Sequence, residues 1–279
     1  MPELPEVQTI VNDLVAAGLT GIPINGARVY WSRTIAEPSA DSFCRQIRNR
    51  HFTAIGRRGK FLVFGLSDGR AMLLHLRMSG RLHLVPAKTP RLKHEHVVIS
   101  LQDGRQLRFH DTRKFGRIYL TADPDGILGR LGPEPLDKSF TAKMLAERLK
   151  RHRRLLKPLL LDQSFIAGLG NIYVDEALWD AGLHPRRIAA SLNPPEIKAL
   201  RRAIPRVLKR GLKNLGTSLG TGKANFYSVA RRRGRNTDEL KVFRRTASPC
   251  PRCRTPIERI IVGQRSTHIC PRCQKIQVK

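Results

Sequence analysis

Four of the five cysteines stand near the end of the chain in two C-x2-C pairs. Cys250 and Cys253 form the first pair, Cys270 and Cys273 form the second, and sixteen residues separate them. Four thiolates with this spacing suit one tetrahedral zinc ion, and the intervening stretch can form a β-hairpin that brings the pairs together. A four-cysteine site leaves no position for water, so this zinc would be structural. Unrelated cysteines or a redox pair are the alternatives, and Cys44 is expected to be a buried small hydrophobe.

The chain carries a large excess of positive charge. Lys and Arg number 52 against 22 Asp and Glu, a net charge of +30, whereas ordinary solubility needs a net charge of roughly 2–8 in a small domain. The excess is spread over sequence that looks folded, which indicates a broad surface for a polyanion. Nucleic acid is the first candidate, and a ribosomal or membrane-surface role is the alternative.

The sequence shows neither a membrane span nor a signal peptide. No apolar run approaches the about 20 residues of a membrane span, and the start lacks the apolar stretch of a signal peptide. An odd cysteine count without a secretion signal argues against a disulfide framework. We therefore expect a cytoplasmic protein with no membrane partner.

The hydrophobic pattern predicts an α+β multidomain chain. Apolar residues at i, i+3, i+4 and i+7 predict a helix over 3–17. Short β-rich segments between 22 and 120, separated by Asp-Gly turns at 68–69 and 103–104, predict an antiparallel β-sandwich, with one short helix over 41–49.

The pattern changes after "LGPEPLD". From about residue 140 the segments are helical, whereas 216–245 are rich in glycine and arginine and resemble a loop. We predict three domains: a sandwich with flanking helices over 1–135, a helical domain with the Arg-rich loop over 136–245, and a zinc-finger β-hairpin over 246–279.

The chain terminus offers a reactive group. If Met1 is removed, Pro2 becomes a secondary amine, and α-amino groups have pKa values of about 7.7–8.0, so a neutral nucleophilic fraction exists near neutral pH. Attack on a sugar C1′ would give an iminium ion, and Glu3 could transfer the protons. The alternative is a proline in the first turn of a helix followed by a capping carboxylate.

Four further stretches carry candidate residues. Lys60 follows a glycine turn in "RRGKFLVF", where a plain surface lysine is the alternative. Met78 in "HLRMSG" and Phe115 in "DTRKFG" follow strands and lie beside cations such as Arg113, which suits apolar wedges that unstack a duplex, or else two core residues. Asn171 in "AGLGNIY" stands where a helix N-cap is expected, and the free amides there could bind phosphate or simply cap the helix.

Several motifs occur in order along the chain: "PELPEV", "RRGKFL", "HLRMSG", "DTRKFG", "LGPEPL", "GLGNIYVDEAL" with "AGLHP", and "GQRSTHICPRCQ". Together they resemble the bacterial formamidopyrimidine-DNA glycosylase family, with its relative endonuclease VIII. The motifs are specific and cover all three predicted domains. The resemblance implies a base-excision enzyme with a β-sandwich, a helix–two-turn–helix domain and a zinc finger, acting as a monomer on damaged double-stranded DNA.

The resemblance also implies roles for residues. Pro2 matches the nucleophile, Glu3 the general acid/base, and Lys60 a hairpin lysine that contacts phosphate and assists catalysis. Asn171 matches a phosphate-binding asparagine and Arg265 a zinc-finger arginine that grips phosphates around the lesion and belongs to the catalytic set. The residues that fill the hole left by the everted base are matched by Met78, Arg113 and Phe115.

One region departs from the family pattern. Purine-type members carry a lesion-covering loop followed by a "VYGR"-like strand, whereas 217–237 are rich in arginine here and the following "KVFRR" is more like endonuclease VIII. We expect a glycosylase and β,δ-lyase for formamidopyrimidines and 8-oxoguanine. Oxidised pyrimidines, a non-catalytic zinc-finger DNA-binding protein and an RNA-associated protein are the alternatives.

Overall fold

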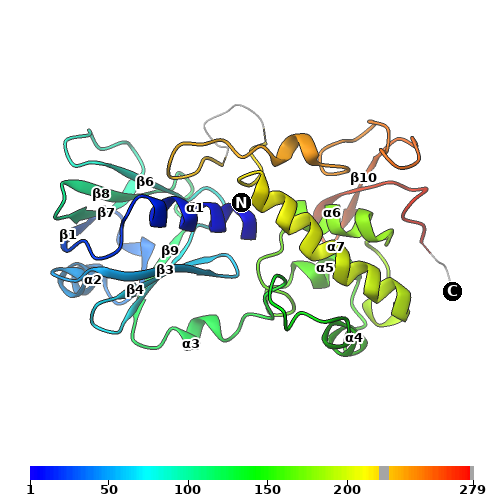
Figure 1. Ribbon diagram of the computed structural model, residues 1–279, viewed down its shortest axis with the longest axis horizontal. Helices are drawn as coiled ribbons and strands as arrows, with labels where there is room; N and C mark the ends of the chain where they lie inside the picture. The colour runs from blue at the N-terminus through cyan, green and yellow to red at the C-terminus, as the bar shows by residue number, and fades with distance from the viewer. Residues whose placement is uncertain (220–225, 277–279) are drawn as a thin grey trace. The chain divides into compact units, whose positions relative to one another are not determined.

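The computed structural model describes residues 1–219 and 226–276, and its chain forms two compact units. The first unit contains Met1–Arg130 together with Asn214–Arg235, and the second contains Leu131–Lys213 together with Asn236–Lys279. Figure 1 shows the strand-rich first unit and the helical second unit. No helix among the described residues is long and apolar enough to cross a membrane.

The first unit is built on two β-sheets. Their strands are β1 (Ile24–Val29), β2 (Ile35–Glu37), β3 (Phe52–Arg58), β4 (Phe61–Leu66), β5 (Ala71–His75), β6 (Arg81–Pro86), β7 (Glu95–Leu101), β8 (Arg105–His110) and β9 (Arg117–Thr121). One sheet has the order β1-β7-β8-β6 and the other the order β2-β9-β5-β4-β3. Neighbouring strands are antiparallel, as predicted, except that β2 pairs with β9 in parallel.

Helices from the first unit complete its core. α1 (Leu4–Ala16) packs against β3, and α2 (Ala40–Ile47) packs against β1, which confirms the two predicted helices. Apolar side chains from both helices and both sheets form one buried cluster. Cys44, expected to be buried, is half-buried at the margin of this cluster, because α2 turns it towards the edge of the core. The remaining helical turns are η1 (Ser32–Thr34) and α3 (Asp125–Leu128).

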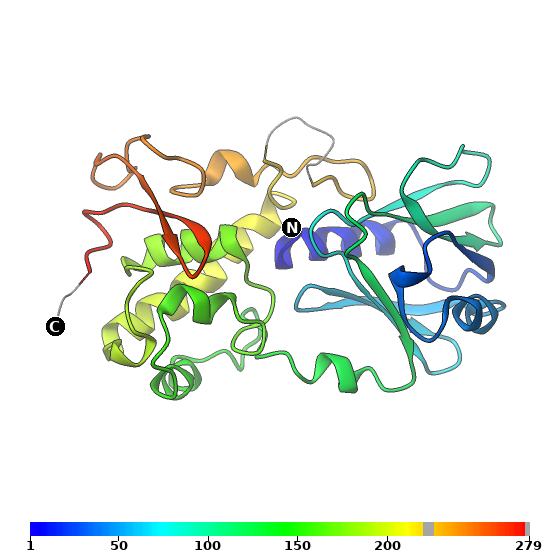
Figure 2. The ribbon, with the colours of Figure 1, turned by 180° about the vertical axis from the view of Figure 1, so that it is seen from behind.

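The second unit places a buried helix at its centre. Its helices are α4 (Ala142–Lys150), α5 (Leu156–Leu161), α6 (Asn171–Ala181), α7 (Pro194–Lys213), η2 (Ala189–Ser191) and η3 (Asn236–Glu239), and its hairpin is formed by β10 (Glu258–Val262) and β11 (Arg265–Ile269). α6 contacts α5, α7 and β11, and eight of its eleven residues are buried. Figure 2 shows the hairpin in front of the helices of this unit.

The segment after α7 differs from its predicted placement. The Arg-rich loop was expected in the helical domain, whereas the described residues up to 235 group with the first unit and those from 236 on group with the second. The reason is a pair of buried carboxylates on α1: Glu6 accepts the Thr217 N–H at 2.7 Å, and Asp13 accepts the Ala230 N–H at 2.9 Å. Residues 220–225 of the 217–237 loop lie outside the described residues. The boundaries 1–135, 136–245 and 246–279 stay predictions.

Candidate functional site

The start of α1 collects ionisable groups around the chain terminus. Glu3 is 3% exposed, and its N–H donates to the Glu6 carboxylate at 2.9 Å, which caps the helix. Burial lowers the pKa of the Met1 α-amino group below its usual range; Glu3 and Glu6 act in the opposite direction, and Lys60 and Arg113 lower it further. The terminus therefore lies within electrostatic reach of Glu3, Lys60 and Arg113, and the neutral amine is favoured.

Lys60 sits in the turn between β3 and β4. Arg58 pairs with Phe61, and Gly59 has a φ of 55°, so Gly59 and Lys60 form a two-residue hairpin turn. Lys60 is only 5% exposed, which excludes the plain surface lysine. Its ammonium group also acts on a neighbour on β5, since burial, Arg77 and Lys60 together lower the pKa of His75 to about 3.

Met78, Arg113 and Phe115 lie on two loops that one buried carboxylate joins. Asp111 is fully buried; its oxygens accept the N–H groups of Arg113 at 3.1 Å and Gly116 at 2.8 Å. The Ser79 hydroxyl of the other loop donates to the same carboxylate and accepts the Arg113 N–H. Asp111 therefore fixes both loops with respect to each other.

The tips of these loops project outward. Met78 is 44% exposed and Phe115 is 49% exposed, which excludes two core residues. The Arg113 guanidinium stacks over the Phe115 ring, 4.9 Å from its centroid. Gly80 and Gly116 at the loop bases press against the buried Phe109 ring, and a Cβ on Gly80 would come within 2.9 Å of it. Two exposed apolar side chains, one of them stacked with a cation, are thus displayed on a rigid base.

In the second unit, Asn171 begins α6 but does not cap it. The N-cap is Gly170, with φ −136° and ψ −165°, so the predicted N-cap is wrong by one residue. The chain is extended at Gly170, and Asn171 is the first helical residue. Its amide donates to the Ser266 carbonyl at 3.0 Å, and its Oδ1 is buried with no hydrogen-bond partner among the described residues.

Ser266 is held from a second direction by a buried ion pair. Lys157 on α5 is fully buried and donates to Asp175 at 2.6 Å and to the Ser266 carbonyl at 3.0 Å. Asp175 also accepts the His268 N–H at 2.9 Å. The hairpin is thereby tied to α5 and α6 beside Asn171. This pair is not among the residues predicted from the sequence, although a lysine inside the apolar run "RLLKPLLLD" indicates a buried cation.

Arg265 opens β11 at the hairpin turn and is exposed. Gly263 and Gln264 have φ values of 54° and 59°, as a two-residue hairpin turn requires. A Cβ on Gly263 would come within 2.7 Å of Pro158, so the turn rests on α5. The second unit therefore brings Asn171 and the start of β11 together through Ser266, which follows Arg265.

Glu176 anchors the segment that leads to the finger. Its buried carboxylate accepts the N–H groups of Lys241, Val242 and Phe243 at 2.9–3.0 Å. Burial raises the pKa of Glu176 above its usual range, while these donors and Arg210 oppose the rise.

The four paired cysteines form a compact sulfur cluster. Their sulfur atoms all lie within 4.8 Å of one another, and Cys253 is 3.3 Å from Cys270 and 3.4 Å from Cys273. Tetrahedral zinc with bonds of about 2.3 Å needs sulfur separations of about 3.8 Å. The Trp179 indole donates to Cys250 at 3.4 Å, which supports a thiolate at that position. The donor set fits one zinc ion.

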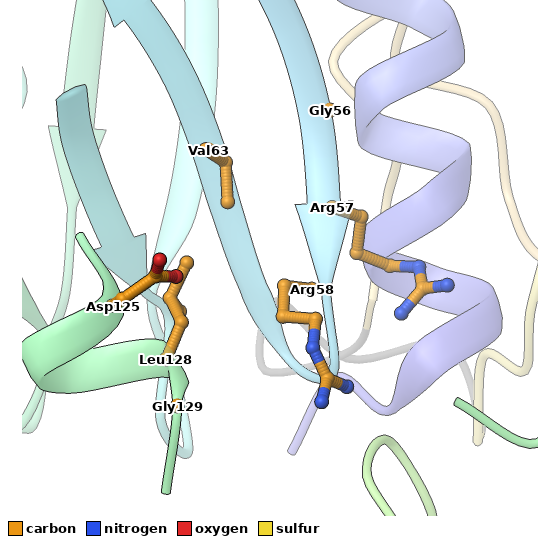
Figure 3. A pocket seen from close by; sticks show the side chains of 7 residues that line it. All are labelled: Gly56, Arg57, Arg58, Val63, Asp125, Leu128 and Gly129. Carbon is orange, nitrogen blue, oxygen red and sulfur yellow. The ribbon is translucent and has the colours of Figure 1, made fainter. Parts of the chain in front are cut away.

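A separate pocket of about 460 Å³ lies between β3, β4 and α3. Figure 3 shows Arg57 and Arg58 on one side and Asp125 and Leu128 on the other. Arg57 points towards α1, where it donates to Gln8 at 3.2 Å. The predicted site residues are not among its lining residues, so this pocket is not the site assembled above.

Fold and site define a class: an α+β zinc-finger protein with a sandwich, a helical layer and a four-cysteine hairpin. Family models match all three parts. The formamidopyrimidine-DNA glycosylase N-terminal domain matches residues 1–118, its H2TH domain matches 131–222, and the zinc finger found in FPG and IleRS matches 247–276. The chain belongs to the formamidopyrimidine-DNA glycosylase family, and its four cysteines form a structural zinc site.

Relatives are similar over their full length. The formamidopyrimidine-DNA glycosylase of Protochlamydia amoebophila is 48% identical, covering 99% of this chain and 100% of the relative. That of Herpetosiphon aurantiacus is 44% identical, covering 98% and 100%.

Solved structures agree with this. The Lactococcus lactis enzyme bound to abasic-site DNA is 33% identical with a TM-score of 0.90, covering 98% of this chain and 100% of that one. Its complex with Fapy-dG-containing DNA has a TM-score of 0.89, at 33% identity and the same coverage.

Proposed function

We propose that this chain is a base-excision-repair DNA glycosylase that removes oxidised bases and then cleaves the abasic site as a lyase. Family membership supports the proposal, and so do the damaged-DNA complexes of the Lactococcus lactis relative. The observation that carries it for this chain is the chain terminus ahead of α1, where the Met1 α-amine, which the Pro2 amine would replace once Met1 is removed, interacts with Glu3, Lys60 and Arg113.

The chemistry follows from a terminal secondary amine. After Met1 is removed, the Pro2 nitrogen attacks C1′ and loses its proton; the glycosidic bond breaks, its electron pair leaves with the base, and the base takes up a proton. The C1′–O4′ bond then opens, its electron pair stays on O4′, which takes up a proton, and the nitrogen lone pair forms the C1′=N bond. The resulting iminium draws electrons from C2′, whose proton is lost as the 3′ phosphate leaves, and the 5′ phosphate leaves in a second elimination. Glu3, which is buried beside the amine, transfers the protons. Lys60 contacts phosphate and assists catalysis.

The exposed loop tips suit DNA whose damaged base has left the stack. The base must be flipped because C1′ is unreachable in a stacked duplex. Met78 and Phe115 fill the hole, and Arg113 donates to the partner base. Asn171 and Arg265 hold phosphates around the lesion, with Arg265 also in the catalytic set. The Asn171 amide NH2 has two hydrogens and uses one on the Ser266 carbonyl, so the other can donate to a phosphate oxygen.

The substrate we favour is a ring-opened purine. Arg113 can donate to the acceptors of cytosine, and a damaged, poorly stacked base costs less to evert. Because the 217–237 segment lacks the lesion-covering pattern, formamidopyrimidines are proposed to be removed faster than 8-oxoguanine. The second candidate is an endonuclease VIII-like preference for oxidised pyrimidines, which the "KVFRR" segment favours.

We also infer three domains with the boundaries 1–135, 136–245 and 246–279, a monomeric state, and a place in the bacterial cytosol or nucleoid. Sedimentation of the DNA-free protein tests the monomer.

Borohydride trapping tests the enzyme class. The protein should form a covalent complex with abasic duplex, and Pro2→Gly should largely abolish both trapping and strand cleavage. Pro86→Gly, the same change at an exposed position at the end of β6, is the control and should trap normally. Undiminished cleavage by Pro2→Gly, or a retained Met1 in the active protein, contradicts the nucleophile assignment and favours a non-catalytic DNA-binding protein.

Single-turnover rates on matched duplexes test the substrate. The expected order is formamidopyrimidine, then 8-oxoguanine, then thymine glycol, with cytosine preferred opposite. Faster removal of thymine glycol than of either purine lesion overturns this choice.

A further inference from the structure

The outer face of α7 carries a row of cations that the proposed chemistry does not use. Lys198, Arg202, Arg206, Lys209 and Lys213 follow one another at spacings of three or four residues, and all five are exposed. At 100° per residue they fall within about 80° of the helix circumference. We call these five residues the α7 stripe.

The charge of the α7 stripe is not neutralised within the described part of the chain. Arg206 pairs with Asp180 at 2.8 Å, whereas the other four cations have no carboxylate partner among the described residues. The single acidic residue of α7, Glu196, forms an ion pair with Arg187 at 2.8 Å and not with the stripe. Four unpaired cations on one rigid helix form an anion-binding surface rather than a network of surface ion pairs.

The α7 stripe points away from Asn171 and Arg265. The opposite side of α7 is buried, and Gly211 on that side meets the Tyr173 ring of α6. Tyr173 and Asp180 face α7, whereas Asn171 and Asp175 on the other side of α6 bond to β11. α7 is in front in Figure 1 and the β10–β11 hairpin is in front in Figure 2, in agreement with these contacts.

The dimensions of the α7 stripe match a duplex backbone. Fifteen residue steps at 1.5 Å span about 22 Å of helix axis. A duplex carries one phosphate charge per about 1.7 Å of its axis, so that length presents about thirteen phosphates. The ammonium and guanidinium groups make contacts that do not depend on base sequence.

We propose that the α7 stripe is a second DNA-binding surface, which holds another duplex segment through its phosphates while the lesion occupies the first site. The bound partner is undamaged double-stranded DNA, and binding there would let the protein pass between DNA segments without release. This goes beyond the excision reaction, and it needs no residue assigned to that reaction.

The test uses protein whose first site is already filled. The full chain is trapped by borohydride on a short abasic duplex, and binding of a fluorescent undamaged duplex is then measured against salt. The variant carries Lys198→Gln, Arg202→Gln, Lys209→Gln and Lys213→Gln, since glutamine preserves length and helix propensity. The control removes the same charge from the first unit through Arg45→Gln, Arg48→Gln, Lys88→Gln and Lys93→Gln.

Trapped wild type and trapped control should bind the second duplex. The α7 variant should bind it at least tenfold more weakly, with a log–log salt slope reduced by about 3 to 4. Excision on the short duplex should be equal in all three proteins. The proposal fails if trapped wild type binds no second duplex, if the α7 variant binds it normally, or if that variant also loses excision. Tighter binding of single-stranded RNA would overturn the choice of partner, and failure of trapping itself would count against the proposed function instead.

Discussion

The two units organise their candidate site residues by different chemistry. In the first unit, buried carboxylates accept backbone N–H groups: Glu6 accepts from Glu3 and Thr217, and Asp111 accepts from Arg113 and Gly116. In the second unit, where Glu176 also accepts backbone N–H groups, a buried ion pair and four thiolates bind segments that are distant in the chain. A carboxylate that accepts from a loop fixes that loop, whereas a metal or buried ion pair supports a whole layer. Disruption in the second unit should therefore have the larger effect.

The largest effect is expected at the zinc site. Cys253→Ser removes one thiolate, and the finger depends on its metal because structural zinc contributes about 10–16 kcal/mol in finger peptides. DNA binding should fall more than 100-fold, and metal analysis should find less than one zinc per chain. Cys44→Ser, outside the cluster, is the control and should retain zinc and binding. Full binding by metal-free protein would contradict this prediction.

A smaller effect is expected from the buried ion pair. Lys157→Met leaves Asp175 without its cation, and breaking a buried pair from one side costs about 3–5 kcal/mol of unfolding free energy. Arg206→Met breaks the pair with Asp180, in which the arginine is 61% exposed, and should cost less than about 1 kcal/mol. Urea denaturation measures both. Equal losses of unfolding free energy in the two variants would contradict the view that burial makes the Lys157–Asp175 pair more important for stability than the Arg206–Asp180 pair.

In the first unit, Asp111→Asn should act locally. Asparagine keeps one acceptor oxygen but turns a donor towards the loops, at a cost of about 1–3 kcal/mol. Because the two loops are then no longer held in place with respect to each other, Arg113 is positioned less precisely against the partner base. The preference for cytosine opposite the lesion should therefore decrease, while trapping on abasic DNA persists. Asp103→Asn, at an exposed turn carboxylate that accepts from Arg105, is the control. Loss of trapping in Asp111→Asn would mean that its role extends beyond the loops.

The smallest effect is a pH dependence in the first unit. The pKa of His75 is lowered to about 3, chiefly by burial, whereas an unfolded histidine titrates near about 6.5. The unfolded chain therefore binds the extra proton between these values, and stability falls as the pH drops below about 6.5. His75→Gln should reduce the stability loss between pH 7 and pH 5.5 by about 1 kcal/mol. An unchanged pH profile would show that His75 is protonated in the fold.

Local patterns predicted the elements, but not the residues that join them. The helix over 3–17 and the turns at Gly69 and Gly104 follow from periodicity and Asp-Gly pairs. β3 does not stand out in the sequence, because "FTAIGRR" contains a glycine and ends in two arginines, and its pairing with β4 along its whole length is what defines it. The Asn171 cap was misplaced because side-chain preference favoured asparagine over the glycine whose backbone takes that position.

The remaining differences between the prediction and the structure arise from hydrogen-bond and ion-pair partners that are distant in the chain. Asp175 bonds to Lys157 and His268, which are 18 and 93 residues away, and Glu6 bonds to Thr217, 211 residues away. A buried polar residue looks like a surface residue until its partner is known, since only the pairing makes burial tolerable. Asp111 and the placement of 214–235 could not be predicted for this reason.

The shared contact of Gly80 and Gly116 with Phe109 limits how the two exposed loops can be redesigned. A side chain at Gly116 would need a smaller residue at Phe109, and a smaller residue there would remove the support of the Gly80 loop. At Gly80 itself an added Cβ would also overlap the Leu76 carbonyl oxygen, so this position requires glycine. The loops must therefore change together, and a transplanted loop will fit only if position 109 is transplanted with it. Laboratory evolution of a new partner-base preference should thus yield linked substitutions in all three segments rather than independent ones.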